Sequence, residues 1–237
     1  MALGTERSRR GNDPLGILGS RGRRVGDGER NALALNALLL GDRQSGRSSV
    51  GNALIGGEEF HTGVCFSGVS VTTEHKLLSR NFPRCFRRQG AESDLLLSVI
   101  DTPPLLPRPH RVHELCPEGV HVLVLVVRAD LPHGNTQLEE HVEILFGPEW
   151  RRHALLVVTH ADRLKEAGLK PSAYLTEASD WLRALADGVE GGVAFLDNSC
   201  DWPSVRGRPL RERLLRLSAR NHHRAATLRT LNSEHKP

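Results

Sequence analysis

The sequence predicts an α/β fold whose central sheet is mainly parallel. Three nearly continuous apolar runs, at residues 95–100, 121–127 and 154–158, have the composition of strands buried on both faces. Stretches with helical signals lie between the strands. Buried strands that alternate with helices are typical of a three-layer architecture, with helices on both faces of one sheet.

Each element has its own signal. A first strand is expected at about 33–40, and the loop at 41–48 leads from it into a helix that Gly56 and Gly57 end after Ile55. The other expected elements are a strand at about 69–78, turns at 81–83 and 87–90, a helix at 136–146 with capping-box spacing, a helix from Pro171 to about Leu185, a short strand at 193–196, and a last helix that starts near Pro209.

Length and composition indicate one domain with two tails. Of the 237 residues, we assign 1–32 to a disordered basic tail, 33–220 to the domain and 221–237 to a C-terminal tail. The net charge of +4 comes from arginine-rich ends, interpreted as solvated tails. Peripheral contact with anionic lipid stays open, and no nucleic-acid partner is expected.

The compartment follows from cysteine usage and hydropathy. The four cysteines are far apart and none belongs to a C-x-x-C pair, which argues against a zinc site or a disulfide framework. No apolar run reaches the length of about 18 residues that a membrane span needs. We therefore expect a cytoplasmic protein without a transmembrane segment.

Residues 41–48 form a phosphate-binding loop, G-x-x-x-x-G-K-[ST], in which Arg47 replaces the lysine. Glycines allow the backbone to wrap around phosphate oxygens, and backbone N–H groups at the head of a helix attract anions. An arginine keeps the charge but is planar and bulkier than lysine. The candidate nucleotide-binding residues here are Gly41, Asp42, Arg43, Gln44, Ser45, Gly46, Arg47, Ser48 and Ser49.

Three residues are candidates for Mg²⁺, which prefers hard oxygen ligands. Ser48 is the first, with Ser49 as a weaker alternative one place out of register. Asp101 follows a buried strand, where nucleotide-binding domains hold the metal, although it could simply begin a turn. Thr72, or alternatively Thr73, stands where a GTPase switch supplies a threonine, and a β-branched pair that starts a strand is an equally ordinary explanation.

A second motif predicts recognition of guanine. Thr159, His160 and Asp162 match [NT]-K-x-D with histidine for lysine. A carboxylate at Asp162 would accept hydrogen bonds from guanine N1–H and the 2-amino group, which adenine lacks. The alternative is that Asp162 caps the next helix. Asn198 is a weaker candidate, placed to approach the O6 edge of the base.

Together these residues resemble the immunity-associated nucleotide-binding GTPases, the IMAP or GIMAP family. The segment from Gly46 to Gly56 is similar to G-K-S-x-x-G-N-S-I-L-G, and 119–126 with 145–147 is similar to the box between the third and fourth motifs of that family. The resemblance covers about residues 35–220. It implies a Ras-like G domain that binds GTP or GDP with Mg²⁺, often with GTP-dependent self-association at or near membranes.

The sequence also departs from the family pattern. Pro104 replaces the glycine whose N–H meets the γ-phosphate, and a proline has no N–H. Residues 101–119 are short and proline-rich and nearly lack the helix that helps to form the paired interface of the family. Only His110 and His113 are candidates there to position a water. We therefore expect guanine-nucleotide binding with little or no hydrolysis; the alternatives are a slow GTPase switch and an ATP-using protein.

Overall fold

The computed structural model describes residues 32–62, 75–103, 109–131, 137–199 and 202–229. Within them lies one six-stranded sheet with the order β2-β3-β1-β4-β5-β6. The strands are β1 (Ala32–Gly41), β2 (Lys76–Arg88), β3 (Ala91–Asp101), β4 (Val122–Arg128), β5 (Ala154–Thr159) and β6 (Val193–Phe195). All neighbouring pairs are parallel except β2 and β3. The expected mainly parallel sheet is confirmed.

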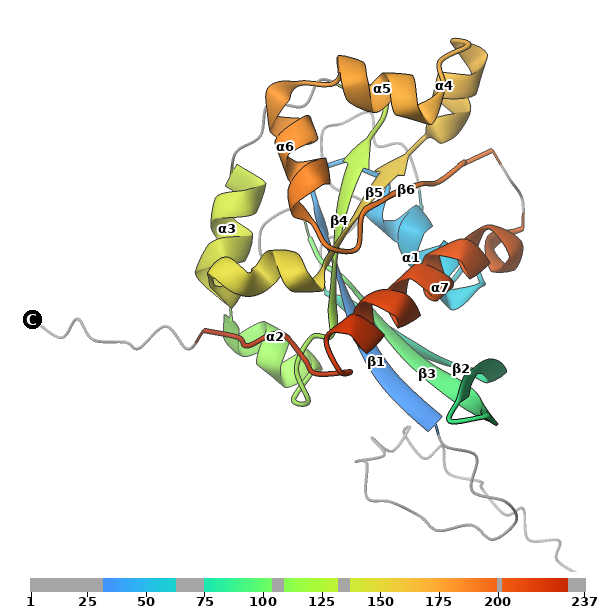
Figure 1. The fold of residues 1–237 in the computed structure, drawn as a ribbon, viewed down its shortest axis with the longest axis vertical. Helices are drawn as coiled ribbons and strands as arrows, with labels where there is room; N and C mark the ends of the chain where they lie inside the picture. Colours follow the sequence, from blue (N-terminus) through green and yellow to red (C-terminus); the bar gives the residue numbers. More distant parts are fainter. Residues whose placement is uncertain (1–31, 63–74, 104–108, 132–136, 200–201, 230–237) are drawn as a thin grey trace, which may run out of the picture. The chain divides into compact units, whose positions relative to one another are not determined.

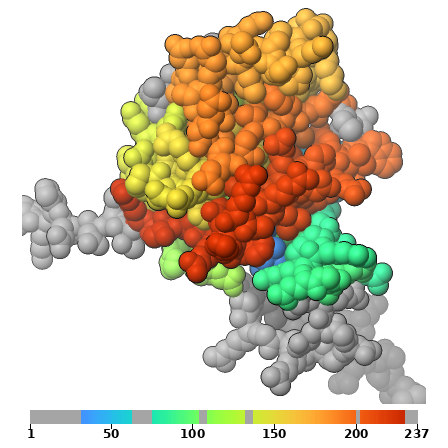
Figure 2. All heavy atoms as spheres, viewed as in Figure 1, coloured from blue at the N-terminus to red at the C-terminus, as the bar shows by residue number. Residues whose placement is uncertain are grey.

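Helices cover both faces of the sheet (Figure 1). One core cluster joins the sheet to α1 (Arg47–Ile55) and α7 (Pro203–Arg220). The cluster on the other face includes side chains from α2 (Pro109–Leu115), α3 (Gln137–Phe146), the 3-10 helix η1 (Pro148–His153) and α6 (Asp180–Gly188). Figure 2 shows α7 beside the β2–β3 hairpin, and Arg211 of α7 lies 4.4 Å from the ring centre of Phe82 in β2. The expected three layers are present.

Most strands fall where the apolar runs predict them. All six residues of β5, and β4 up to its final arginine, are buried. β3 is an exception, since Leu96 is 41% exposed although the run predicted burial on both faces. This difference arises because β3 lies next to the edge strand β2 rather than in the middle of the sheet.

The second strand differs from its prediction. β2 starts at Lys76 and continues to Arg88, through the predicted turn at 81–83; residues 63–74 lie outside the described part. Pro83 is accommodated where the register shifts between Phe82 and Phe86, because an edge strand with a bulge tolerates a residue without an N–H. The chain turns only at Gln89 and Gly90, both with positive φ.

Two helical predictions need correction, and one short helix was not predicted. The expected helix from Pro171 is split into α5 (Pro171–Glu177) and α6, because Ser179 accepts a hydrogen bond from Leu182 N and caps a new helix. α7 begins at Pro203, so Pro209 lies inside it. The region expected nearly to lack a helix contains only the short α2, whose first position suits Pro109. A short α4 (Ala161–Glu166) was not predicted.

The chain beyond α7 remains in contact with the domain. Ala226 is 7% exposed, and its N–H donates to the Val120 carbonyl at 2.7 Å. Within the described residues, no helix is long and apolar enough to cross a membrane.

Candidate nucleotide-binding site

The loop between β1 and α1 lies at the carboxyl end of the parallel strands. Gly41 is the last residue of β1, and a Cβ atom there would come within 2.3 Å of the Val126 carbonyl oxygen. Gly46 has a φ of 89°, and a Cβ atom there would lie 2.9 Å from Thr159 Oγ1. Both positions of the motif therefore require glycine for steric reasons.

The side chains of this loop divide by exposure. Ser45 and Arg47 are buried, and Ser48 and Ser49 are half-buried. The outer part of the loop, Asp42, Arg43 and Gln44, is exposed.

Ser48 and Asp101 are brought together from α1 and the end of β3. Ser48 Oγ donates to Asp101 Oδ2 at 2.6 Å, and Asp101 is 1% exposed. A hydroxyl and a carboxylate are the hard oxygen donors that Mg²⁺ prefers, so this pair fits the metal. Thr72, the third expected ligand, lies outside the described residues.

Arg47 is the first residue of α1 and is only 6% exposed. Within the described residues, its Nη1 atom is buried and has no hydrogen-bond partner, and the same is true of Ser45 Oγ. Burial lowers the pKa of the Arg47 guanidinium, while the nearby charges of Asp101 and Asp42 act in the opposite direction. The loop therefore holds a buried cation whose donors are not all used.

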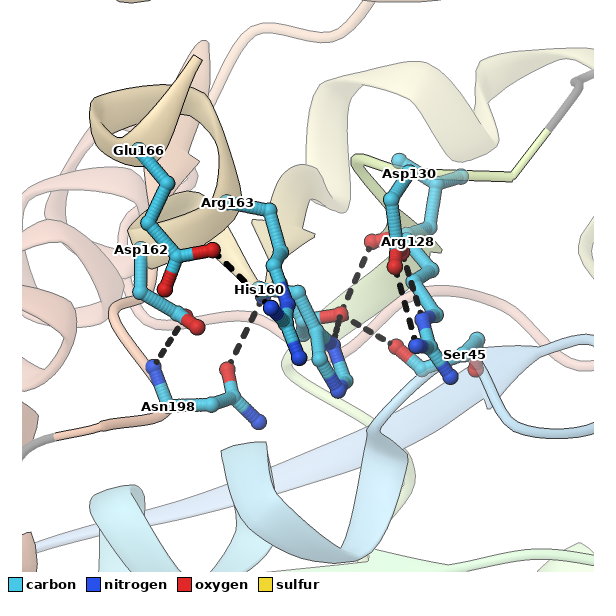
Figure 3. A network of polar contacts seen from close by, with 10 residues as sticks. Ser45, Arg128, Asp130, His160, Asp162, Arg163, Glu166 and Asn198 are labelled. Atoms are coloured by element: carbon cyan, nitrogen blue, oxygen red, sulfur yellow. Dashed lines mark hydrogen bonds and ion pairs between the residues drawn. The ribbon is translucent and has the colours of Figure 1, made fainter.

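The second motif forms a small hydrogen-bonded unit after β5 (Figure 3). The N–H of His160 donates to Asn198 Oδ1 at 2.9 Å, and the N–H of Asn198 donates to Asp162 Oδ1 at 3.0 Å. Lys165 Nζ contacts Asp197 Oδ2 at 2.5 Å, and this bond, together with the hydrogen bonds from Ser199, lowers the pKa of Asp197 to about 2. Asn198, a weak candidate on sequence, is thus tied directly to the motif.

Thr159 joins this unit to the phosphate loop. Its Oγ1 donates to the Ser45 carbonyl at 2.6 Å and lies 3.2 Å from the Val127 carbonyl. Since carbonyl oxygens only accept, the contact of 3.1 Å between His160 Nδ1 and Thr159 Oγ1 places a proton on Nδ1. Burial, followed by the charge of Arg128, lowers the pKa of His160, which favours the neutral ring with a lone pair on Nε2.

Comparison with known proteins decides the family. A profile described as the AIG1 family matches residues 35–207. The chain belongs to the AIG1 family. It is 29% identical over 177 residues to human GTPase IMAP family member 8, a match that covers 69% of this chain and 24% of that protein. The chain thus spans about a quarter of the length of this curated relative. The resemblance to the immunity-associated GTPases is confirmed.

Two solved structures of Toc33 from Arabidopsis thaliana are similar to this AIG1 chain. A dimerization-deficient mutant is 20% identical with a TM-score of 0.49, covering 83% of this chain and 88% of that one. The complex with Mg²⁺ and GMPPNP is 21% identical with a TM-score of 0.46, covering 84% and 89%. The sheet order and the loop after β1 themselves define a P-loop α/β fold, the Ras-like G domain.

One half-buried histidine that feels the charge of Asp101 was not identified from the sequence. His75 precedes β2, and its Nε2 atom is buried without a hydrogen-bond partner among the described residues. Burial and the charge of Arg111 lower the pKa of His75, whereas the charge of Asp101 raises it. No motif marks His75; its only signal is its place soon after the expected Thr72.

A second missed feature is the forked pair of Arg128 and Asp130. Arg128 Nε and Nη2 donate to the two carboxylate oxygens of Asp130 at 2.6 and 3.0 Å, and these bonds lower the pKa of Asp130. Figure 3 shows the pair on the opposite side of His160 from Asp162. The fork fixes a planar arginine beside the motif. A sequence cannot distinguish this pair from two solvated charges.

Proposed function

We propose that this AIG1 domain binds a guanine nucleotide, GTP or GDP, and hydrolyses GTP slowly or not at all. The observation that carries the proposal is the bond from Thr159 Oγ1 to the Ser45 carbonyl at 2.6 Å. It joins the phosphate loop to the base motif, so that one ligand with a phosphate tail and a base can reach both. The family supports this, since its curated relative is named a GTPase.

The hydrogen bonding of the Asp162 carboxylate favours guanine over adenine as the bound base. One carboxylate oxygen accepts the Asn198 N–H. Within the described residues, the other oxygen has no hydrogen-bond partner, so it is available to a ligand. Guanine offers N1–H and a 2-amino group on one edge, whereas adenine offers an acceptor at N1 and no 2-amino group. A buried polar group left unpaired by the wrong base gives strong discrimination.

The metal part of the proposal concerns Ser48 and Asp101. Their oxygens would hold Mg²⁺, which supplies positive charge to the phosphate tail when it is bound. Asp101 is almost fully buried at the end of β3 and is held by the Ser48 hydroxyl, which keeps both oxygens in place. Thr72 remains a sequence prediction for the same site.

Slow or absent hydrolysis is inferred from two substitutions in the motifs. Phosphoryl transfer depends on charges and an oriented water placed around the γ-phosphate. Arg47 changes the shape of the cation at the phosphates, and Pro104 removes an N–H that a GTPase uses there. A slow GTPase switch remains the alternative, and an ATP-using protein is the second.

Base recognition is tested by exchanging the hydrogen-bonding character of Asp162. Wild-type protein should bind fluorescent GDP at least about tenfold more tightly than ADP. The variant Asp162→Asn should lose affinity for GDP and gain affinity for xanthosine diphosphate, because an amide can donate to the C2 carbonyl of xanthine. Asp187→Asn, on an exposed part of α6, is the matched control. Equal affinity of the wild type for GDP and ADP would refute the guanine assignment.

Hydrolysis is tested separately by single-turnover release of phosphate from GTP. The expected rate does not exceed that of the same solution without protein. A clearly higher rate that Ser48→Ala abolishes would establish the slow GTPase instead.

A further inference from the structure

We propose that the guanidinium of Arg47, rather than a divalent cation, neutralises most of the phosphate charge, so that GDP binds with an affinity that hardly depends on Mg²⁺. This inference rests on the proposed nucleotide-binding function and concerns the ion chemistry of the same site.

The first observation is the burial of an incompletely bonded cation. Arg47 is 6% exposed, and its Nη1 has no hydrogen-bond partner among the described residues. A guanidinium remains protonated in proteins, so a buried one carries its charge with it. Leaving such a group without a partner is strongly unfavourable, whereas a phosphate oxygen would satisfy both its charge and its free donor.

The second observation is the place of Arg47 on its helix. It is the first residue of α1, whose N-cap, Gly46, makes no side-chain hydrogen bond to the first turn. The N-terminus of a helix attracts anions and disfavours a cation. The guanidinium and the positive end of the helix dipole thus repel each other electrostatically until an anion lies between them.

The third observation is the relation of Arg47 to the carboxylate of the candidate metal site. The nearby charges that attract the Arg47 guanidinium are those of Asp101 and Asp42, with Asp101 the stronger. Asp101 also accepts the Ser48 hydroxyl at 2.6 Å. A divalent cation that entered beside Asp101 would be repelled by a fixed cation in a medium of low dielectric constant. The same guanidinium already offsets the charge of Asp101.

The chemistry of arginine completes the argument. A lysine ammonium is a compact point charge, whereas a guanidinium has five N–H donors in a planar fork that matches two phosphate oxygens at once. Such a fork can donate hydrogen bonds and supply positive charge to phosphate oxygens that a metal ion would otherwise bind. The occupant of this site is therefore a nucleoside diphosphate bound without an obligatory metal.

The experiment is a titration of the full chain with fluorescent GDP, in millimolar Mg²⁺ and in excess EDTA. The two dissociation constants of the wild type should differ by less than about threefold, because most of the tail charge is neutralised by Arg47. Arg47→Gln should bind GDP at least about tenfold more weakly in EDTA and recover part of that loss in Mg²⁺. Arg87→Gln, an exposed arginine on β2, should behave as the wild type.

A second variant keeps the test decisive if Arg47→Gln does not fold. Ser48→Ala removes the hydroxyl expected to bind Mg²⁺. Its affinity relative to the wild type should be the same in Mg²⁺ as in EDTA, within about threefold. A loss of tenfold or more that appears only in the Mg²⁺ buffer would overturn the inference.

Two failures can be told apart. If wild-type protein binds GDP in Mg²⁺ but at least about tenfold more weakly in EDTA, the inference fails and the proposed function stands. If folded wild-type protein binds no guanine nucleotide in either buffer, both fail.

Discussion

The two ends of helix α1 differ in how their polar groups are satisfied. At the C-terminal end, Gly56 donates its N–H to the Asn52 carbonyl at 2.7 Å, and Arg211 Nη1 donates to the Ala53 and Leu54 carbonyls at 3.0 and 3.1 Å. At the N-terminal end, no side chain caps the helix. The C-terminal end is thus closed by the protein itself, whereas the N-terminal end has no side-chain cap and is where we propose that the ligand binds.

The same contrast appears in two buried arginines. Arg211 is 8% exposed and Arg47 is 6% exposed, so burial alone does not distinguish them. Arg211 uses Nη1 for two carbonyls of α1 and Nη2 for the Ser204 carbonyl, and as a cation it is favoured at a helix C-terminus. Arg47 is a cation at the N-terminus with an unused donor. A buried charge therefore marks a ligand site only when the protein leaves it unpaired.

The largest expected effect on stability comes from a substitution at the contact between α7 and the C-terminal end of α1. A Cβ atom at Gly207 of α7 would lie 1.5 Å from the Ala53 carbonyl oxygen, a backbone atom that cannot move aside cheaply. Gly207→Ala should therefore lower the free energy of unfolding by more than about 4 kcal/mol, measured by urea denaturation. A cost below about 1 kcal/mol would contradict the close contact between α1 and α7.

The next test applies one substitution to both arginines. Arg211→Met should destabilise the ligand-free protein by about 3 kcal/mol, because several carbonyls lose a charged donor. Arg47→Met should instead change the stability of the ligand-free protein by less than about 1 kcal/mol, because removing a buried cation with an unused donor is offset by the loss of its attraction to Asp101. The extra stability that GDP confers should disappear only in Arg47→Met. Denaturation curves with and without GDP provide both measurements.

Similar destabilisation by both methionine variants would remove the distinction between the two ends. A loss of GDP stabilisation in Arg211→Met, with its fold intact, would show that the C-terminal end also supports the site.

Local patterns predicted much of this fold. The continuous apolar runs located β4 and β5, because burial on both faces requires apolar residues along the whole strand. The loop from Gly41 to Gly46 located the start of α1, because close backbone approach requires glycine. The split between α5 and α6 could not be foreseen, since a serine inside a helical stretch shows its capping role only through its bond to Leu182. The length of β2 depends on pairing with β3 rather than on its own residues.

The sequence identified the residues of the candidate site but not how their polar atoms are hydrogen-bonded. The motifs named Ser48, Asp101 and Asp162, and the structure brings the first two within 2.6 Å. The sequence identified Arg47 as a substitution, yet its unused donor follows from packing. Arg211 contacts α1 across 158 positions of sequence and looks like a surface arginine when read alone. Long-range contacts of single polar residues leave no periodic signal.

A smaller effect is expected from the residue that ends α1. Gly56 has a φ of 76°, a conformation that costs a residue with a side chain about 1 kcal/mol. The nearest atom to an added Cβ is the Ser204 Cα at 3.4 Å, so packing adds little. Gly56→Ala should therefore lower the free energy of unfolding by about 1–2 kcal/mol, as measured by urea denaturation. Gly56→Asn should lower the free energy of unfolding by less than Gly56→Ala does, because asparagine tolerates a left-handed conformation.

Neither Gly56 variant should alter the affinity for GDP by more than about twofold, since this residue closes the end of α1 that faces away from the phosphate loop. Titration with fluorescent GDP provides the comparison. If Gly56→Ala weakened GDP binding about tenfold while the domain stayed folded, the two ends of α1 would be coupled, and the closed end would belong to the binding machinery. An unchanged affinity together with the expected loss of stability would show that the C-terminal end of α1 contributes to folding stability but not to the proposed binding of GDP at the N-terminal end.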